Sequence, residues 1–168
     1  MSIINQRQSI RKFDPSQPIE QAKIDQLIAA GLSAPSSKNK RPWHFVVIND
    51  LALIANFATA HQNWGGLGTA TALILVCNDL RIEEREGHSL MTCSAASQNI
   101  LLSATEQGLA SVWMGMYPDE ERMNYAKKTL GMPDYICPIS VIALGYPATP
   151  ICEKIRVPEP EKVHVNHW

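Results

Sequence analysis

The 168-residue sequence lacks the features that mark a membrane protein or a nucleic-acid-binding protein. It has no apolar run near the roughly 18 residues of a membrane span, and its net charge of -1 gives no general attraction to DNA, RNA or anionic lipid. Residues 1–5 show no basic segment followed by a long apolar run, so no secretory signal is expected. With 45% hydrophobic and only 18% charged residues, we expect one globular domain with a sizeable core.

Cysteine is scarce and scattered, with no C-x-x-C pair. The spacing therefore indicates neither a disulfide scaffold nor a zinc knuckle, and it favours a reducing, cytoplasmic compartment. Most of the thiols stand among apolar neighbours, so packing is favoured over a redox role, which would need a nearby base. His164 and His167 have a metal-like spacing, but their apolar neighbours favour anchoring of the tail, and no metal site is expected. The four cysteines are Cys77, Cys93, Cys137 and Cys152.

Hydrophobic periodicity predicts alternating helices and strands without internal repeats. Residues 72–76 form a continuous apolar run, which is typical of a strand buried on both faces. Residues 63–68 form a glycine-rich loop, and Gly31 is expected to end the first helix. The other expected elements are helices at 18–30, after Asp50, at 88–107 and after Asp119, and strands at 43–48 and 139–144.

The last residues, 147–168, differ from the rest in having several prolines, mixed charge and no helical period. Such a segment cannot form a central strand, yet it is too apolar for an ordinary disordered tail. We expect an extended arm that lies across another surface, which in a homodimer is often the partner subunit. Its apolar residues are Ile151, Ile155, Val157, Val163, Val165 and Trp168.

Two small basic clusters stand near opposite ends of the chain. The first is Arg7-Gln8-Ser9-Ile10-Arg11, and the second contains Lys154 and Arg156. Arginine offers a two-pronged donor for phosphate, lysine a point charge and serine a hydroxyl donor. If the fold brings the ends together, they form a clamp for a small dianion; otherwise they are solvated surface charges.

Several motifs, in a fixed order, resemble those of the nitroreductase family of FMN-dependent NAD(P)H oxidoreductases. Each motif is weak alone, but the resemblance extends over nearly the whole chain. The motifs are R-Q-S-I-R-K-F at 7–13, A-P-S-S-K-N-K-R-P-W at 34–43, S-Q-N-I-L-L at 97–102, G-L-A-S-V-W-M-G at 108–115, G-Y-P at 145–147 and K-I-R at 154–156.

The resemblance implies an α+β fold: a three-layer α-β-α sandwich with a central, mostly antiparallel sheet. One domain, residues 1–168, would form a domain-swapped homodimer with FMN at the interface and with the extended arm, residues 147–168, exchanged. The resemblance also implies the residues that hold the flavin. The phosphate would be held by Arg7, Ser9, Lys154 and Arg156, with Gln8 also at the cofactor; the ribityl chain or the N1/O2 edge by Arg11, with Arg41 as a second candidate cation; the ring by the partner's Pro35, Ser36, Ser37 and Asn39; and the N5 side by Met114, Gly115 and Met116.

In this family the flavin carries the redox chemistry, so no catalytic side chain is required. The resemblance implies ping-pong electron transfer from NAD(P)H to nitroaromatic, quinone or similar electrophilic acceptors. The alternative is a flavin-binding protein for storage or redox sensing, without turnover. Trp64 and Tyr117 are candidates for the walls of the substrate pocket.

The chain departs from the family pattern in three ways. Arg41 stands where the family has Gln, and Thr92 stands near a common Asp. A long helical insertion over the pocket is also missing. We therefore expect a more open pocket and an altered environment for the flavin.

Overall fold

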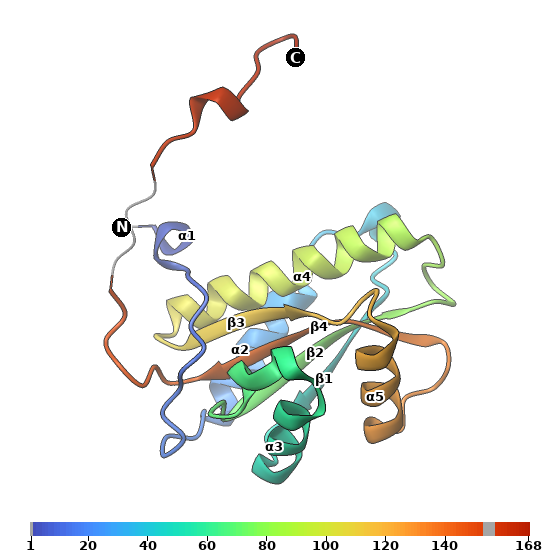
Figure 1. Cartoon of the computed structure of the whole chain (residues 1–168). Coiled ribbons are helices and arrows are strands. Elements are labelled where there is room, and N and C mark those ends of the chain that lie inside the picture. Colours follow the sequence, from blue (N-terminus) through green and yellow to red (C-terminus); the bar gives the residue numbers. More distant parts are fainter. Residues whose placement is uncertain (1, 153–156) are drawn as a thin grey trace.

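A four-stranded antiparallel sheet forms the centre of the molecule, in the order β1-β2-β4-β3 (Figure 1). The computed structural model describes residues 2–152 and 157–168. The predicted α+β class with a central antiparallel sheet is confirmed. The strands are β1 Trp43–Ile48, β2 Ala72–Asp79, β3 Ala110–Gly115 and β4 Ile136–Gly145.

Helices cover both faces of this sheet (Figure 1). One face packs against α2 and α4, and the other packs against α3, α5 and the short helix η2. Every residue of β2 is buried, as its continuous apolar run predicts, and burial of one such large side chain contributes roughly 1.5–3 kcal/mol. The helices are α1 Ile3–Gln6, α2 Gln21–Leu32, η1 Ser37–Asn39, α3 Leu51–Ala60, η2 Gln62–Leu67, α4 Glu86–Glu106, α5 Glu120–Leu130 and η3 Pro160–Lys162.

Helix ends follow the capping residues of the sequence. The carboxylate of Asp50 accepts hydrogen bonds from two backbone N–H groups at the start of α3, and Asp119 accepts one at the start of α5. Gly131 ends α5 with a left-handed φ of 62°. The prediction that Gly31 ends α2 is wrong, because the helix continues to Leu32 and Gly31 is buried inside it. Glycine is required there by packing, since a Cβ would lie 2.9 Å from the Phe45 ring.

The N-terminal segment after α1 passes from the start of β3 to the end of β4. Ser9 forms a parallel bridge with Ser111 of β3, and Phe13 forms an antiparallel bridge with Pro147 just after β4. The Phe13 side chain is buried in the core. This segment is therefore anchored at both ends, with Ser9 beside β3 and Phe13 beside the end of β4.

Gly145 is the contact that admits Phe13. A Cβ at Gly145 would lie 2.9 Å from Phe13 Cβ and 3.1 Å from Cγ, and these atoms cannot move without shifting the segment. Gly145→Ala is therefore expected to lower the free energy of unfolding by about 1–3 kcal/mol, as overpacking does. Urea denaturation measures this effect. Gly87→Ala is the matched control, because no atom lies within 4 Å of its added Cβ; equal stability of the two variants would contradict the prediction.

The described part of the arm projects from the body of the molecule (Figure 1). Its apolar side chains are exposed, and Trp168 is 101% exposed with only His164 stacked on it, at 4.4 Å between ring centroids. Exchange of the arm with a partner subunit stays a prediction. Among the described residues, no helix has the length and hydropathy needed to cross a membrane.

Candidate functional site

The outer edge of β3 carries unpaired backbone groups. In an antiparallel ladder, alternate residues bond to the neighbouring strand and those between them point outward. Met116 N–H donates to the Ile139 carbonyl at 3.0 Å, so Ser111, Trp113 and Gly115 direct their backbone groups away from β4. The edge is therefore a row of donors and acceptors.

Both ends of this row are occupied. Ile10 N–H donates to the Ser111 carbonyl at 2.9 Å, and Arg122 Nη1 donates to the Gly115 carbonyl at 2.9 Å. Between them, no residue in the described part of the chain bonds to the N–H or carbonyl of Trp113 or to the N–H of Gly115. A planar ligand with its own acceptors and donors could pair with these groups.

The first basic cluster lies beside the C-terminal arm. Gln8 Nε2 donates to the Cys152 carbonyl at 2.7 Å, which places this segment next to the chain two residues before Lys154. Lys154 and Arg156 themselves lie outside the described residues. Within the described residues, the first cluster therefore meets the arm at Cys152, and the clamp itself stays a prediction.

Side chains of the first cluster are spread along the extended segment. Arg7 is half-buried, Ser9 and Arg11 are exposed, and the Arg11 stem packs against Gly66 of η2. Residues two apart on an extended chain share one side, so Arg7, Ser9 and Arg11 are expected to face the same way.

The loop 35–41 is held in an unusual backbone conformation. Lys38, Asn39 and Arg41 all have φ between 52° and 53°, the left-handed region that non-glycine residues rarely occupy. Arg41 N–H donates to Ser36 Oγ at 3.0 Å, and Ser37 Oγ lies 2.9 Å from His88 Nδ1. Such strain persists only where the surroundings enforce it, and it is concentrated at functional sites.

A cavity of about 270 Å³ adjoins this loop. Thr92, near the position where the family commonly has Asp, is buried and lines this cavity. The Arg41 side chain turns elsewhere: Nη2 donates weakly to the Leu32 carbonyl at 3.4 Å, and the guanidinium lies over the Trp43 ring. The cavity is lined by Pro35, Ser36, Ser37, His88, Met91, Thr92 and Ala95.

Glu83 organises the loop, and sequence reasoning missed it. Its carboxylate is 1% exposed and bonds to the Arg85 guanidinium at 2.7–2.8 Å, with Lys40 at 3.3 Å and His88 at 3.9 Å. Hydrogen bonds from Arg85 lower the pKa of Glu83 to about 2. Glu83 stands in a charged stretch of the sequence where nothing distinguishes it from exposed neighbours, because its burial is set by the fold.

The same physics makes stability depend on acid pH. The pKa of Asp79 is also lowered to about 2, mainly by hydrogen bonds from Arg81, so both carboxylates titrate well below their ordinary values of 3.8 and 4.5. Their contribution is present above the unfolded-state pKa and is lost as pH falls toward 2. We expect the melting temperature of the wild type to drop as the pH falls from about 4.5 toward 2, and that of Glu83→Gln to drop less. The assignment would be contradicted if the melting temperatures of the two proteins fell by the same amount between pH 6 and pH 2.

The first basic cluster, residues 7–11, and the loop 35–41 lie at opposite ends of α4 (Figure 1). The cavity beside the loop contains Thr92, whereas a second cavity of about 300 Å³, beside Gln6 and Gln8, contains Thr105. Thirteen residues of helix separate them by about 20 Å. Within one chain, the first basic cluster and the loop 35–41 therefore do not belong to one pocket.

Trp64 and Tyr117 do not line a common pocket either. Trp64 is fully buried and stacks on Phe57, with 5.8 Å between ring centroids, so it is a core residue. Tyr117 packs with the cluster on the other face of the sheet. Trp64 is buried because η2 packs onto the sheet, which its glycine-rich sequence did not indicate.

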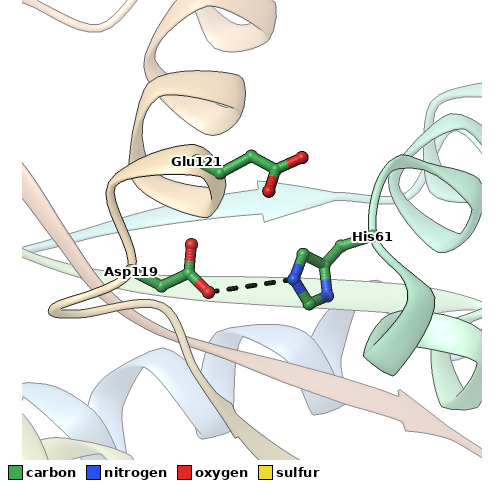
Figure 2. Close-up of side chains that lie close together, drawn as sticks. All are labelled: His61, Asp119 and Glu121. Carbon is green, nitrogen blue, oxygen red and sulfur yellow. Dashed lines mark ion pairs between the residues drawn. The ribbon is translucent and has the colours of Figure 1, made fainter.

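His61, Asp119 and Glu121 meet at the start of α5, with ligand atoms within 4.8 Å of one another (Figure 2). His61 Nε2 lies 3.8 Å from Asp119 Oδ2. A cation already stands there: Arg122 Nε lies 3.0 Å from Asp119 Oδ2, and Arg122 Nη2 lies 3.4 Å from the His61 ring. The positive charge that this cluster attracts is thus supplied by the chain itself.

Fold and site together define an α+β sandwich protein with a basic segment beside an open strand edge. The model of the nitroreductase family matches residues 4–64 and 58–146. The chain belongs to this family.

Individual relatives agree with this membership. A protein from Methanothermobacter thermautotrophicus, provisionally named NADH dehydrogenase/NAD(P)H nitroreductase, is 35% identical over 100% of this chain and 87% of its own length. The crystal structure of a protein with the same provisional name from Bacteroides thetaiotaomicron VPI-5482 is 40% identical, with a TM-score of 0.90 over 99% of this chain and 96% of that one. An FMN-dependent nitroreductase from Clostridium difficile R20291 has a TM-score of 0.91 at 26% identity and covers 99% of both chains.

Proposed function

We propose that this protein is an FMN-dependent NAD(P)H oxidoreductase that reduces nitroaromatics, quinones or similar small electrophiles. The observation that carries the proposal is the open β3 edge beside the basic segment at 7–11. Family membership and the relatives' names support the same activity. The four free cysteines fit the reducing, cytoplasmic compartment that we propose for it.

The residues present fit FMN. Ser9 lies beside Ser111 at one end of β3 and Gly115 lies at the other end, about 13 Å away at the rise of a strand. This spacing is comparable with the length of FMN from phosphate to ring. Arg7 and Ser9 would hold the phosphate, while the free backbone groups of Trp113 and Gly115 would pair with the edge of the ring.

The second half of the site would come from a partner subunit. The loop 35–41, with its strained backbone and its cavity, lies at the far end of α4 from Arg7. It is therefore too far away to contact a flavin held by Arg7 of the same chain. A homodimer that pairs this loop with the β3 edge of the other copy completes the pocket. The exposed apolar residues of the arm would be buried in the same assembly.

The protein's role is binding and orientation. FMN held at this site would supply the redox chemistry between NAD(P)H and the acceptor, in the ping-pong order proposed for the protein. Arg7 and Ser9 fix one end of the cofactor, and the Gly115 backbone allows close approach because it has no Cβ. Arg11, held against Gly66, supplies positive charge near the N1/O2 edge, where reduction adds negative charge.

The test is direct. The purified protein should be a yellow dimer, and addition of NADH or NADPH without oxygen should bleach its flavin band. Menadione or nitrofurazone should then restore the colour with multiple turnovers. A protein that binds FMN but is not bleached by either nucleotide is a storage or sensing protein, and one that binds no FMN contradicts the proposal altogether.

A further inference from the structure

Arg122 joins three elements next to the β3 edge. Its Nη1 donates to the Gly115 carbonyl at 2.9 Å, its Nε is ion-paired with Asp119 at 3.0 Å, and its Nη2 lies 3.4 Å from the His61 ring. These partners belong to the end of β3, the start of α5 and the junction of α3 with η2. The Arg122 side chain is only 18% exposed, so the guanidinium is held among them.

The position of the arginine is itself fixed by helix capping. Asp119 Oδ1 accepts the Arg122 backbone N–H at 3.1 Å, while Asp119 Oδ2 contacts its guanidinium. The same carboxylate therefore begins α5 and orients the side chain one turn later. The guanidinium has little freedom to leave the Gly115 carbonyl.

The Gly115 carbonyl needs such a partner. It points to the outer edge of β3, together with the unpaired N–H groups of Trp113 and Gly115. Glycine lacks a Cβ, so the peptide after it can rotate more easily than at any other residue. Without a partner, this carbonyl would face a ligand on the same edge directly and would oppose any negative charge there.

We propose that Arg122 is a positioning residue of the flavin site, which rests on the function proposed above. By donating to the Gly115 carbonyl, it covers the acceptor oxygen at this end of β3 and leaves backbone N–H donors to face the ring. Its positive charge lies at the same outer edge, where it favours the reduced, more negative flavin. Arg122 thus acts on the flavin through Gly115 and does not touch the reacting atoms.

The neighbouring side chains do not offer another group for this role. The cation of Arg122 accounts for the cluster of His61, Asp119 and Glu121 without a metal ion. The neighbouring carboxylates are partly exposed, so water shares in their solvation. Among the described residues, Arg122 is the one side chain that bonds to an outward backbone group of β3.

The experiment compares Arg122→Ala and Arg122→Lys with Lys128→Ala, which removes the same charge from an exposed position on the same helix. For Arg122→Ala we expect a more negative midpoint potential of bound FMN and flavin reduction by NAD(P)H that is about tenfold slower or more, because small misplacements at a reacting centre are costly. Arg122→Lys should fall between, since lysine keeps the charge but cannot bridge both partners. Millimolar guanidinium should partly restore Arg122→Ala alone.

A second readout does not need the cofactor. Amide hydrogen exchange at Met116 and Tyr117, whose N–H groups donate to the Ile139 carbonyl, should be faster in cofactor-free Arg122→Ala than in wild type or Lys128→Ala. If wild type fails to bind FMN, the proposed function fails, but this exchange measurement still tests whether Arg122 holds the Gly115 carbonyl. The proposal is overturned if Arg122→Ala, or Arg122→Lys should the alanine variant not fold, shows wild-type exchange, or wild-type potential and reduction rate.

Discussion

Replacing Arg7 with alanine is expected to weaken FMN binding by about 1.5–3 kcal/mol, or about tenfold to 150-fold in Kd. Arg7 lies two residues before Ser9, whose backbone is bridged to Ser111 at the start of β3, so the proposed phosphate end of the ligand lies next to it. A charge-assisted hydrogen bond to phosphate is lost, and solvent replaces it only in part. Fluorescence titration of the cofactor-free protein with FMN measures the change.

A phosphate clamp formed by Arg7 and Arg156 makes a further prediction about the double variant. If Arg7 and Arg156 hold the same phosphate, the losses from Arg7→Ala and Arg156→Ala should not add in the double variant. Lys12→Ala is the matched control, because Lys12 is an exposed cation on the opposite side of the same extended segment. Wild-type retention of FMN by the double variant on gel filtration would remove the phosphate assignment.

Gly115→Val is expected to abolish detectable FMN binding while leaving the fold intact. The nearest atom to a Cβ at Gly115 is the Tyr117 carbonyl oxygen at 3.9 Å, an ordinary contact, and Gly115 does not have a positive φ. A branched side chain is favourable in a strand, so the cofactor-free protein should lose little or no stability. The added methyl groups would instead occupy the space proposed for the ring.

A graded series separates these effects. FMN affinity should fall from glycine to alanine to valine at position 115, while the free energies of unfolding of the cofactor-free proteins, measured with urea, stay within about 0.5 kcal/mol of one another. Gly145→Ala provides the contrast, because there the added Cβ meets Phe13 and stability falls first. Tight FMN binding by Gly115→Val would show that the ring lies elsewhere.

Local chemistry explains why much of the fold was predictable. Asp50 and Asp119 cap the helices that the sequence assigned to them, because a cap depends on residues only two or three positions away. The apolar run of β2 was also predictable, because a strand covered by helices on both faces is apolar at every position. Gly31 failed as a helix end because its role depends on Phe45, fourteen residues further along the chain.

The candidate site was predictable in its parts but not in its arrangement. The ordered motifs indicated the family, and the structure places Ser9 beside β3, while its role at the phosphate stays a prediction. Trp64 was expected at a pocket wall but lies fully buried, since aromatic residues suit both environments. Glu83 and Arg122 carried no signal, because charged residues are exposed in most sequences and only burial sets these two apart.

The sequence by itself determined the α+β class, the caps, the buried central strand and the family, since all of these follow from patterns local to the chain or from ordered motifs. Tertiary structure alone decided which backbone groups of β3 stay unpaired, that Gln8 meets the arm at Cys152, and that Arg122 holds the Gly115 carbonyl. The physical reason is that hydrogen-bond partners and burial at these positions depend on segments brought together only when the sheet and its layers form.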